Sequence, residues 1–458
     1  MSGPRVVVIG GGLAGLTAAL AVADRGGEVV LLERRPRLGG ATWSFQRHGC
    51  WFDNGQHVFL RCCTAYRGLL ERLGVADRVV LQDRLEIPVI APGGRRSWLR
   101  RGVGPAPLHL ARSLLGYRHL PVADRLRLGR VARALRGVDP EAPYADTQNF
   151  GAWLQDQGQS EVAIDRLWDV IVRPTLNIGA RDASLAMAAM VLRTALFGDR
   201  AAGDLGWARV PLAELHARAA TAALTRVGVR VHQRARVDAI ETMEGAVSAV
   251  RVDGERLAAD AVVVAVPHDE VAGLLPRGAL DAPERCVELG MSPIVNVHVI
   301  YDRRVTELAV AACIDSPVEW VFDRTEAAGV EDGQCLSVSI SAATAELGQP
   351  AAALIRTHVA ALAGLFPAAA DARVREALVT REGHATFRAV PGSGARRPPS
   401  DTGISGLFLA GAWTSTGWPA TMEGAVRSGL VAAAKALPSA RVADGVDGYS
   451  PDRRWVAA

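Results

Sequence analysis

Residues 6–15 read Val-Val-Val-Ile-Gly-Gly-Gly-Leu-Ala-Gly, and this stretch decides the fold of the 458-residue chain. The β-branched run predicts a buried strand, and the alanine-rich segment after it predicts a helix over Leu13–Ala23. Gly10 allows a sharp turn off the strand, Gly12 lets the backbone approach a pyrophosphate, and Gly15 lets the helix pack closely on the sheet. The free N–H groups at the start of such a helix bind phosphate. We therefore predict a dinucleotide site made by Gly10, Gly12, Leu13, Ala14 and Gly15.

The segment after this motif supports the same interpretation. Residues 29–32 are again apolar, and Glu33 follows at the C-terminal tip of the second predicted strand. Its carboxylate is placed to accept hydrogen bonds from both hydroxyls of a ribose, and its charge disfavours the 2′-phosphate of NADP. A glycine pair, Gly39-Gly40, lies between Arg34 and Ala41, and a plain nicotinamide dehydrogenase does not need it. A glycine-rich turn without a ligand is the alternative, but three consecutive glycines cost conformational entropy that a tight turn does not require.

Composition sets the class of protein. The length and a hydrophobic content of 49% predict two or three lobes with extensive cores. The net charge of +4 is small, Lys435 is the only lysine, and no motif for reading nucleic acid is present. The six cysteines form neither a C-x-x-C pair nor a Cys/His zinc pattern, so we expect no metal site and the reduced thiols of a cytoplasmic protein.

Residues 6–22 are apolar enough to imitate a signal sequence or a short membrane span. We reject both interpretations because a glycine triplet is a poor helix interior and the charged region before it is only Arg5. The dinucleotide motif accounts for the stretch better.

Residues 88–137 form an arginine-rich segment that differs in composition from the residues before it. Eleven arginines lie between Arg95 and Arg136 against the single acid Asp124, and interleaved leucines give residues 88–137 a basic amphipathic helical texture. One interpretation is a patch at the mouth of a lipid site that contacts the inner face of the cell membrane peripherally. The other is a solvated, arginine-rich helical cap, and the sequence does not decide between them.

Later segments return to strand patterns. Residues 229–232, 236–240 and 247–252 alternate, and residues 261–267 are apolar throughout, which predicts a buried parallel strand. Residues 294–301 and 335–341 predict strands of a second sheet. Near the end, residues 406–411 predict a strand that runs into a glycine, followed by an alanine-rich helix to Leu437. We therefore expect the dinucleotide domain to be assembled from separated pieces. His268, His298 and His384 are isolated in sequence and are expected to be structural.

Taken in order, the N-terminal motif, Leu38-Gly39-Gly40, residues 261–267 and residues 408–411 resemble the flavin-dependent amine oxidase and phytoene desaturase superfamily across nearly the whole chain. Residues 53–57 and 416–425 are most similar to its squalene-associated branch, the hydroxysqualene dehydroxylases. The resemblance implies an α/β fold in which a Rossmann-like FAD-binding domain is interrupted by a mixed-sheet and helical substrate domain. The implied FAD-binding parts are residues 1–85, 206–275 and 381–440, with a helical, membrane-facing domain at 86–205, a substrate sheet at 276–380 and a tail at 441–458.

The resemblance also implies residue roles. Beyond Gly10, Gly12, Leu13, Ala14, Gly15 and Glu33, it places FAD against residues that stand in the family's motifs: Arg34, Gly39, Gly40, Ala41, Gly55, Val237, Gly411, Ala412, Ala420, Thr421 and Met422. The candidate catalytic residues are His57, Asp53, Asn54 and Gln56, with His57 or Asp53 favoured as proton donor. Each has a structural alternative, such as a turn cap for Asp53, and Glu423 has one as the residue that fixes the helix carrying Met422.

Two positions depart from the family pattern. Ala412 stands where relatives commonly carry an acid that binds the ribityl chain, and Ala41 stands where many carry arginine. Each change removes a polar contact worth about 0.5–3 kcal/mol. These changes weaken the affinity for FAD, whereas the choice of FAD as cofactor rests on the backbone contacts, which remain.

The implied reaction is the reductive removal of a hydroxyl from a lipophilic C30 isoprenoid, hydroxysqualene, to give squalene. It requires an acid near the leaving oxygen, an apolar tunnel and exclusion of water. Because only one nucleotide motif is found, we expect an external reductant for the flavin. Two alternatives remain: an oxidative carotenoid-type desaturase or amine oxidase, for which Lys435 lies too far along the last helix, and a non-catalytic prenyl-binding escort protein.

Overall fold

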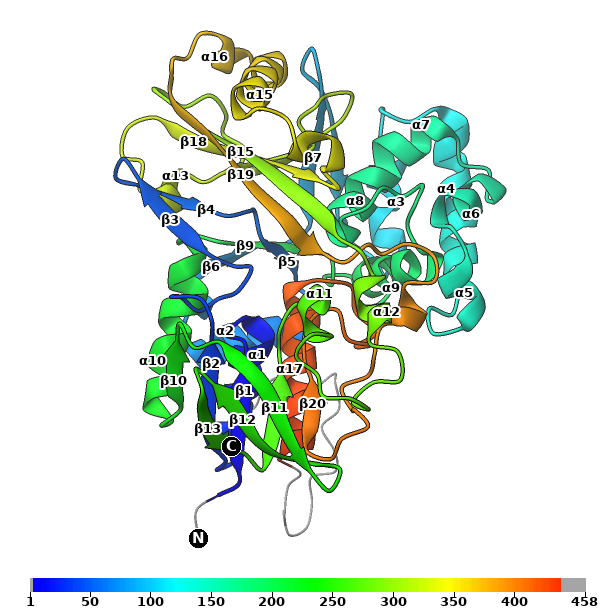
Figure 1. Cartoon of the computed structure of the whole chain (residues 1–458). Helices are drawn as coiled ribbons and strands as arrows, with labels where there is room; N and C mark the ends of the chain where they lie inside the picture. Colours follow the sequence, from blue (N-terminus) through cyan, green and yellow to red (C-terminus); the bar gives the residue numbers. More distant parts are fainter. Residues whose placement is uncertain (1–2, 438–458) are drawn as a thin grey trace.

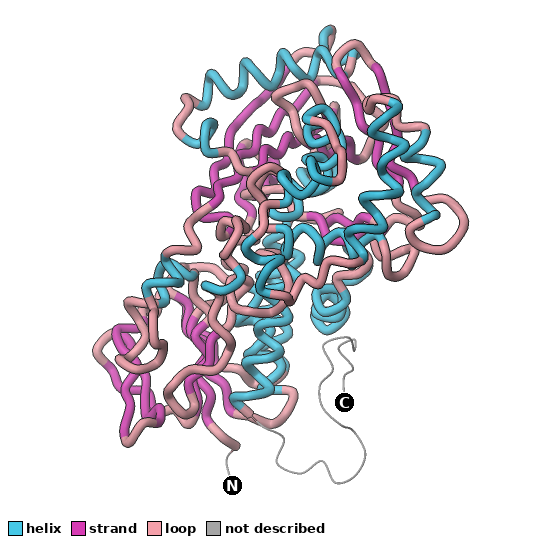
Figure 2. The backbone as a smooth tube through the Cα atoms, turned by 90° about the vertical axis from the view of Figure 1, so that its right-hand side faces the viewer, coloured by secondary structure: helices cyan, strands magenta, loops and turns pink. Residues whose placement is uncertain are grey.

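The computed structural model describes residues 3–437, which form two halves that share a long cavity (Figure 1). Turned by 90°, the strands gather mainly in two groups, one in each half (Figure 2). The tail expected at 441–458 lies outside the described residues. No helix within residues 3–437 combines the length and the apolar character that crossing a membrane requires.

A five-stranded parallel sheet builds the lower half, in the order β10-β2-β1-β14-β20. Its strands come from three distant parts of the chain: β1 (Arg5–Ile9) and β2 (Glu28–Glu33), β10 (Arg230–Gln233) and β14 (Ala261–Val264), and β20 (Leu407–Leu409). The helices α1 (Leu13–Ala23) and α17 (Met422–Ala436) pack against each other beside it. The expectation of a nucleotide-binding sheet assembled from separated pieces is confirmed.

Smaller elements complete this half. β11 (Val237–Met243), β12 (Ala246–Val252) and β13 (Glu255–Ala258) form an antiparallel sheet, and α11 (His268–Val271) and α12 (Glu284–Val287) follow β14 and contact each other. The helices α2 (Thr64–Leu73) and α10 (Ala219–Arg226) contact α1 or α17. Between the halves lie the hairpin of β3 (Ser44–Arg47) and β4 (Cys50–Asp53) and a sheet of β5 (Val58–Leu60), β9 (Leu205–Ala208) and β6 (Val79–Leu81).

A seven-stranded sheet forms the upper half, in the order β19-β15-β18-β17-β16-β7-β8. Its strands are β7 (Glu86–Ala91), β8 (Arg95–Arg100), β15 (Ser292–Tyr301), β16 (Val310–Cys313), β17 (Trp320–Asp323), β18 (Gln334–Ser341) and β19 (Val374–Thr386). One face carries Val295, Val297 and Val338, which are fully buried under α15 (Ala351–Leu365). Because side chains alternate along a strand, the other face of the sheet is left for the cavity. The short helices α13 (Thr325–Ala328), α14 (Thr344–Leu347) and α16 (Pro367–Ala370) lie in its connections.

The helical interpretation of residues 88–100 is wrong, because β7 and β8 pair as an antiparallel hairpin there. β7 also pairs in parallel with β16, which lies more than two hundred residues later. The non-local partner buries Val89 and Ile90 completely and overrides the local helical texture. The helices of the arginine-rich segment begin only after this hairpin.

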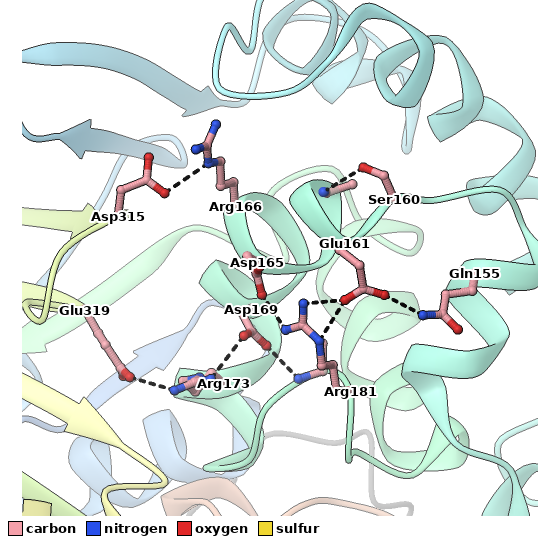
Figure 3. Close-up of polar contacts among 12 residues, drawn as sticks. Gln155, Ser160, Glu161, Asp165, Arg166, Asp169, Arg173, Arg181, Asp315 and Glu319 are labelled. Carbon is pink, nitrogen blue, oxygen red and sulfur yellow. Dashed lines mark hydrogen bonds and ion pairs between the residues drawn. The ribbon is translucent and has the colours of Figure 1, made fainter. Parts of the chain in front are cut away.

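Helices gather on one side of the upper half (Figure 1). They are α3 (Ala111–Leu115), α4 (Val122–Arg136), α5 (Pro143–Thr147), α6 (Phe150–Asp156), α7 (Glu161–Ala163), α8 (Asp169–Leu176) and α9 (Leu185–Leu196). Among them, α3, α4, α8 and α9 line the cavity. Two ion pairs join this helical lobe to the loop between β16 and β17: Arg173 bonds Glu319, and Arg166 bonds Asp315, while Arg173 also pairs with Asp169 within α8 (Figure 3). Such partly exposed pairs stabilise a fold weakly, so their main effect is to orient α8.

Candidate active site

One cavity of about 1680 Å³ runs from the glycine turn after β1 into the helical lobe. Its lower end is lined by the segments that the sequence assigns to a dinucleotide. Its upper end is lined by apolar side chains of the seven-stranded sheet and of α3, α4, α8 and α9. A long flat ligand and a long apolar ligand can therefore meet inside it.

The glycine turns shape the lower end. Gly10 has a φ of +106°, and a Cβ on it would lie 2.4 Å from the carbonyl oxygen of Ala265. A Cβ on Gly40, whose φ is +57°, would lie 2.8 Å from the Cα of Gly12. Side chains are excluded at both positions, so bare backbone faces the cavity, which is what a pyrophosphate requires.

Glu33 and Arg34 follow at the end of β2, where both line the cavity. The two carboxylate oxygens of Glu33 accept hydrogen bonds of 2.7 Å from the backbone N–H groups of Gly11 and Arg35. These contacts fix the carboxylate at the position expected for a ribose. Arg34 bonds Glu270 at 2.6 Å, so its guanidinium is held at the rim by an ion pair.

Two helix N-termini also point to this end of the cavity. Gly12 precedes α1 without any side-chain cap, so the N–H groups of the first turn remain open for an anion. Thr421 precedes α17 and accepts a hydrogen bond from the N–H of Gly424, and Met422 begins the helix. Both helices present a positive dipole end to the same space.

The predicted cofactor residues gather in this part of the cavity. All of them line it except Gly15, which lies where α1 packs on the sheet: a Cβ there would be 1.9 Å from the carbonyl oxygen of Gly10. Gly55, Val237 and the loop that carries Gly411, Ala412 and Ala420 come from three separate segments and meet there. A dinucleotide such as FAD fits this set of groups: two helix N-termini, open backbone and one carboxylate directed at a ribose.

Arg397 also shapes this end of the cavity, although no motif marks it. Its guanidinium is buried and donates hydrogen bonds to the carbonyl oxygens of Ala412 at 3.1 Å, Trp413 at 3.3 Å and Trp418 at 2.7 Å. Burial lowers the pKa of Arg397 to about 10. Its contacts hold the loop between β20 and α17, so this arginine shapes the part of the site where Ala412 replaces the family's acid.

Asp53 does not line the cavity. One oxygen accepts from Arg324 at 2.7 Å, and the other accepts from the hydroxyl of Ser44 at 2.6 Å and the N–H of Leu212 at 3.0 Å. The Asp53 and Arg324 side chains are only 5% and 9% exposed. These contacts favour a structural role, in which a buried ion pair joins β4 to the end of β17.

Asn54, Gln56 and His57 do line the cavity. The side-chain amide of Asn54 accepts from the N–H of Trp43 at 3.1 Å, and Gln56 donates to Ser337 at 2.9 Å. His57 Nδ1 lies 3.0 Å from the carbonyl oxygen of Gly55. Burial lowers the pKa of His57, so its imidazole is neutral, with Nδ1 as donor and Nε2 as acceptor.

Two further acids belong to the site: Glu423, which the sequence analysis considers, and Glu382, which it misses. The buried carboxylate of Glu423 accepts from the N–H of Tyr66 at 2.7 Å and from Arg427 at 2.6 Å, so it ties α17 to the start of α2. Glu382, on β19, lines the cavity and accepts from the indole N–H of Trp43 at 3.1 Å. No local motif marks Glu382, because its place in the site depends on the pairing of β19 with β15.

The upper end opens beside the arginine-rich segment. Leu108, Leu115 and Leu126 line the cavity and are 68%, 55% and 71% exposed. Val103 and Val122, at 93% and 61%, lie in the same segment. The cavity therefore ends in an exposed apolar rim, which we call the leucine rim: Val103, Leu108, Leu115, Val122 and Leu126.

Within residues 3–437 no three His, Cys, Asp or Glu side chains are grouped so as to hold a metal ion. Lys435 pairs with Asp401 and does not line the cavity.

Comparisons with known proteins agree with this geometry. The family described as flavin containing amine oxidoreductase matches residues 13–437. Hydroxysqualene dehydroxylase of Rhodopseudomonas palustris is 31% identical over 95% of this chain and 99% of its own length. A 15-cis-phytoene desaturase of Glycine max is 26% identical over 94% of this chain and 78% of its own. Among solved structures, an oxidoreductase from Methanosarcina mazei has a TM-score of 0.72 at 18% identity, covering 93% of this chain and 99% of that one. The chain belongs to the flavin-containing amine oxidoreductase family and is an FAD-dependent oxidoreductase.

Proposed function

We propose that this enzyme reductively removes the hydroxyl of hydroxysqualene to give squalene, within hopanoid and triterpene biosynthesis. The observation that carries the proposal is one cavity that joins a dinucleotide cradle to a long apolar branch. The name of the relative from Rhodopseudomonas palustris supports the same substrate. FAD, when bound and reduced, supplies the hydride.

The apolar branch excludes water from the reacting carbon. Trp168, Ile171, Trp320 and Phe322 line it, and the rings of Trp320 and Phe322 stack 6.1 Å apart. Aromatic faces stabilise a developing positive charge without offering a nucleophile. Such a lining suits loss of a hydroxyl next to an alkene, where water would trap the cation.

The geometry gives the motif residues different tasks. A neutral His57 with its lone pair on Nε2 is suited to accept a hydrogen bond and not to act as the acid. Asp53 holds Arg324, Ser44 and Leu212 outside the cavity, so we assign it to positioning. Asn54 and Gln56 fix the loops on either side of Gly55 through their bonds to Trp43 and Ser337.

We infer that an external protein or free reduced flavin reduces the bound FAD. The five-stranded sheet carries the single glycine turn of the described residues that matches a nucleotide motif, and FAD, when bound, would fill the cavity at that turn. Rapid bleaching of the flavin by NADPH alone, in the absence of any second protein, would contradict this inference.

We also infer peripheral contact with an anionic membrane through the leucine rim. Arg112, Arg118, Arg127 and Arg133 are exposed on α3, α4 and the turn between them, and none has an ion pair with a carboxylate of residues 3–437. Asp124, the only acid of the segment, is buried and bonded to Ser160. Exposed apolar side chains beside uncompensated cations suit an interfacial helix at the mouth of a lipid cavity.

Product analysis separates this proposal from its alternatives. Holoprotein reduced photochemically under argon is incubated with hydroxysqualene, and the extract is examined by mass spectrometry. Squalene is the expected product. An oxidative desaturase would instead act from oxidised FAD and yield a polyprenyl chain with a new double bond, and a prenyl-binding escort protein would return the alcohol unchanged and purify without flavin.

A further inference from the structure

We propose that Glu382 is the catalytic acid that protonates the leaving hydroxyl, an inference that rests on the proposed function. The sequence motifs do not contain this residue. It lies on β19, at the edge of the seven-stranded sheet, and lines the cavity.

The strand register places Glu382 in a polar row above the cavity. Ile294 on β15 is paired with Glu382 on one side and with Ser341 on the other. Asn296, two residues along, is paired in the same way with Thr380 and Ser339. Because alternate residues share a face, the cavity side of β15, β18 and β19 carries these polar residues beside Ile294, while the opposite side is the valine-rich core under α15.

Glu382 has an open oxygen. Its Oε1 accepts the indole N–H of Trp43 at 3.1 Å, and its Oε2 has no hydrogen-bond partner among residues 3–437. The side chain is half-buried in the cavity wall. One oxygen therefore fixes the carboxyl group while the other is left to meet a ligand.

The other carboxylates of the cavity are already engaged. Glu33 is held by two backbone N–H groups, Glu270 by Arg34, and Glu423 by Arg427 and the start of α2. Asp238 accepts from the N–H of Gly254 and lies beside Val237, in the nucleotide half. Of the cavity's carboxylates, Glu382 is the one on the substrate sheet.

A short chain of contacts positions this acid. The Asn54 side chain accepts from the backbone N–H of Trp43, and the Trp43 indole bonds Glu382. The guanidinium of Arg37 lies 4.4 Å from the Trp43 ring centre. Asn54, predicted from the sequence as a catalytic candidate, thus acts through Trp43 as a positioning residue.

In the proposed step, the proton of Glu382 moves to the hydroxyl oxygen of the substrate. The carbon–oxygen bond breaks, its electron pair leaves with water, and a hydride from the reduced cofactor forms the new carbon–hydrogen bond. The step consumes one proton and one hydride and leaves the Glu382 carboxylate, oxidised FAD, water and squalene. Solvent then returns the proton to Glu382.

The test compares Glu382→Gln with Glu382→Asp and with the matched control Glu376→Gln. Glu376 lies six residues away on the same strand and pairs with Arg47 and His48, away from the cavity. The single-turnover rate of flavin reoxidation by hydroxysqualene is measured across pH under anaerobic conditions. Separately, the dissociation constant of hydroxysqualene for the oxidised holoprotein is measured from the change in flavin absorbance.

General acids contribute about 10²–10⁴-fold, so Glu382→Gln should slow single turnover by about 100-fold or more and remove the fall in rate at rising pH that follows when a general acid loses its proton. Its flavin content and its dissociation constant should stay within a few-fold of the wild type, Glu382→Asp should recover part of the rate, and Glu376→Gln should behave as wild type. A Glu382→Gln variant that turns over at the wild-type rate overturns the inference. If the wild type itself forms no squalene, the proposed function fails instead.

Discussion

The two ends of the cavity are built in opposite ways. At the cofactor end, short motifs act through their backbone: Gly10, Gly12 and Gly40 expose the chain, and the first turns of α1 and α17 offer N–H groups. At the substrate end, side chains from β15, β18 and β19 meet only because the strands pair. A local motif therefore reveals the first end, whereas the strand register is needed to reveal the second.

The largest effect should follow from a side chain placed in the glycine turn at the cofactor end of the cavity. Gly10→Val places a Cβ 2.4 Å from the carbonyl oxygen of Ala265, on backbone with a positive φ. We expect purified protein without flavin, measured by absorbance at the flavin bands. The control is Gly364→Ala on α15, an exposed position with open space around it, which should keep its flavin and gain about 0.5–1 kcal/mol. A yellow Gly10→Val protein would show that backbone approach is not what this end depends on.

Breaking the buried ion pair should give the next largest effect. Asp53→Asn leaves the Arg324 charge buried without its partner, which costs about 3–5 kcal/mol. Urea unfolding measures this loss, and Asp260→Asn, which breaks the exposed pair with Arg5, should cost less than about 1 kcal/mol. If Asp53→Asn is as stable as wild type but inactive, Asp53 belongs to the chemistry and the positioning role is wrong.

Removing charge beside the leucine rim should weaken membrane binding without affecting catalysis on solubilised substrate. Arg125, Arg127 and Arg130 lie on α4, and each charge close to an anionic surface contributes about 1 kcal/mol. Exchanging all three for glutamine should therefore reduce binding to phosphatidylserine-containing vesicles by up to about 100-fold in a sedimentation assay.

The matched control removes the same charge from other faces of the molecule. Arg25, Arg226 and Arg356 are exposed and lie away from α4. Their exchange for glutamine should leave vesicle binding close to that of the wild type. Equal loss in both triple variants would indicate a dependence on net charge alone, and no loss in either would retire the membrane contact.

The smallest effect is a change in the pH dependence of stability. His298 is 2% exposed and burial lowers its pKa to about 4, whereas an unfolded histidine titrates near about 6.5. The contribution of His298 to the free energy of unfolding is complete above pH 6.5 and is lost as the pH falls toward 4. The loss occurs because the unfolded chain then binds a proton that the folded protein does not bind. His298→Gln should flatten this fall by about 1.4 kcal/mol per pH unit in urea unfolding, and exposed His48→Gln should not. Identical slopes for His298→Gln and the wild type would contradict this account.

The sequence predicts correctly those features of the fold that depend on residues close together in the chain. The glycine turn, Glu33 and the strands that return at 261–264 and 407–409 follow from runs of neighbouring residues, and the structure brings them into one sheet. It failed for residues 88–100, where pairing of β7 with β16 overrides a helical texture. It also missed Glu382 and Arg397, because each acquires its surroundings from partners far away in the chain. Asp53 was found by motif, but only its contacts with Arg324 and Leu212 show what it holds.

One anaerobic measurement tests the central claim most directly. FAD-loaded protein is reduced chemically and mixed with hydroxysqualene, flavin reoxidation is followed optically, and the extracted hydrocarbon is identified by mass spectrometry. The account predicts reoxidation matched mole for mole by squalene. A flavin that stays reduced while the alcohol is recovered intact would contradict the dehydroxylase and leave an oxidative polyprenyl desaturase as the function of this fold.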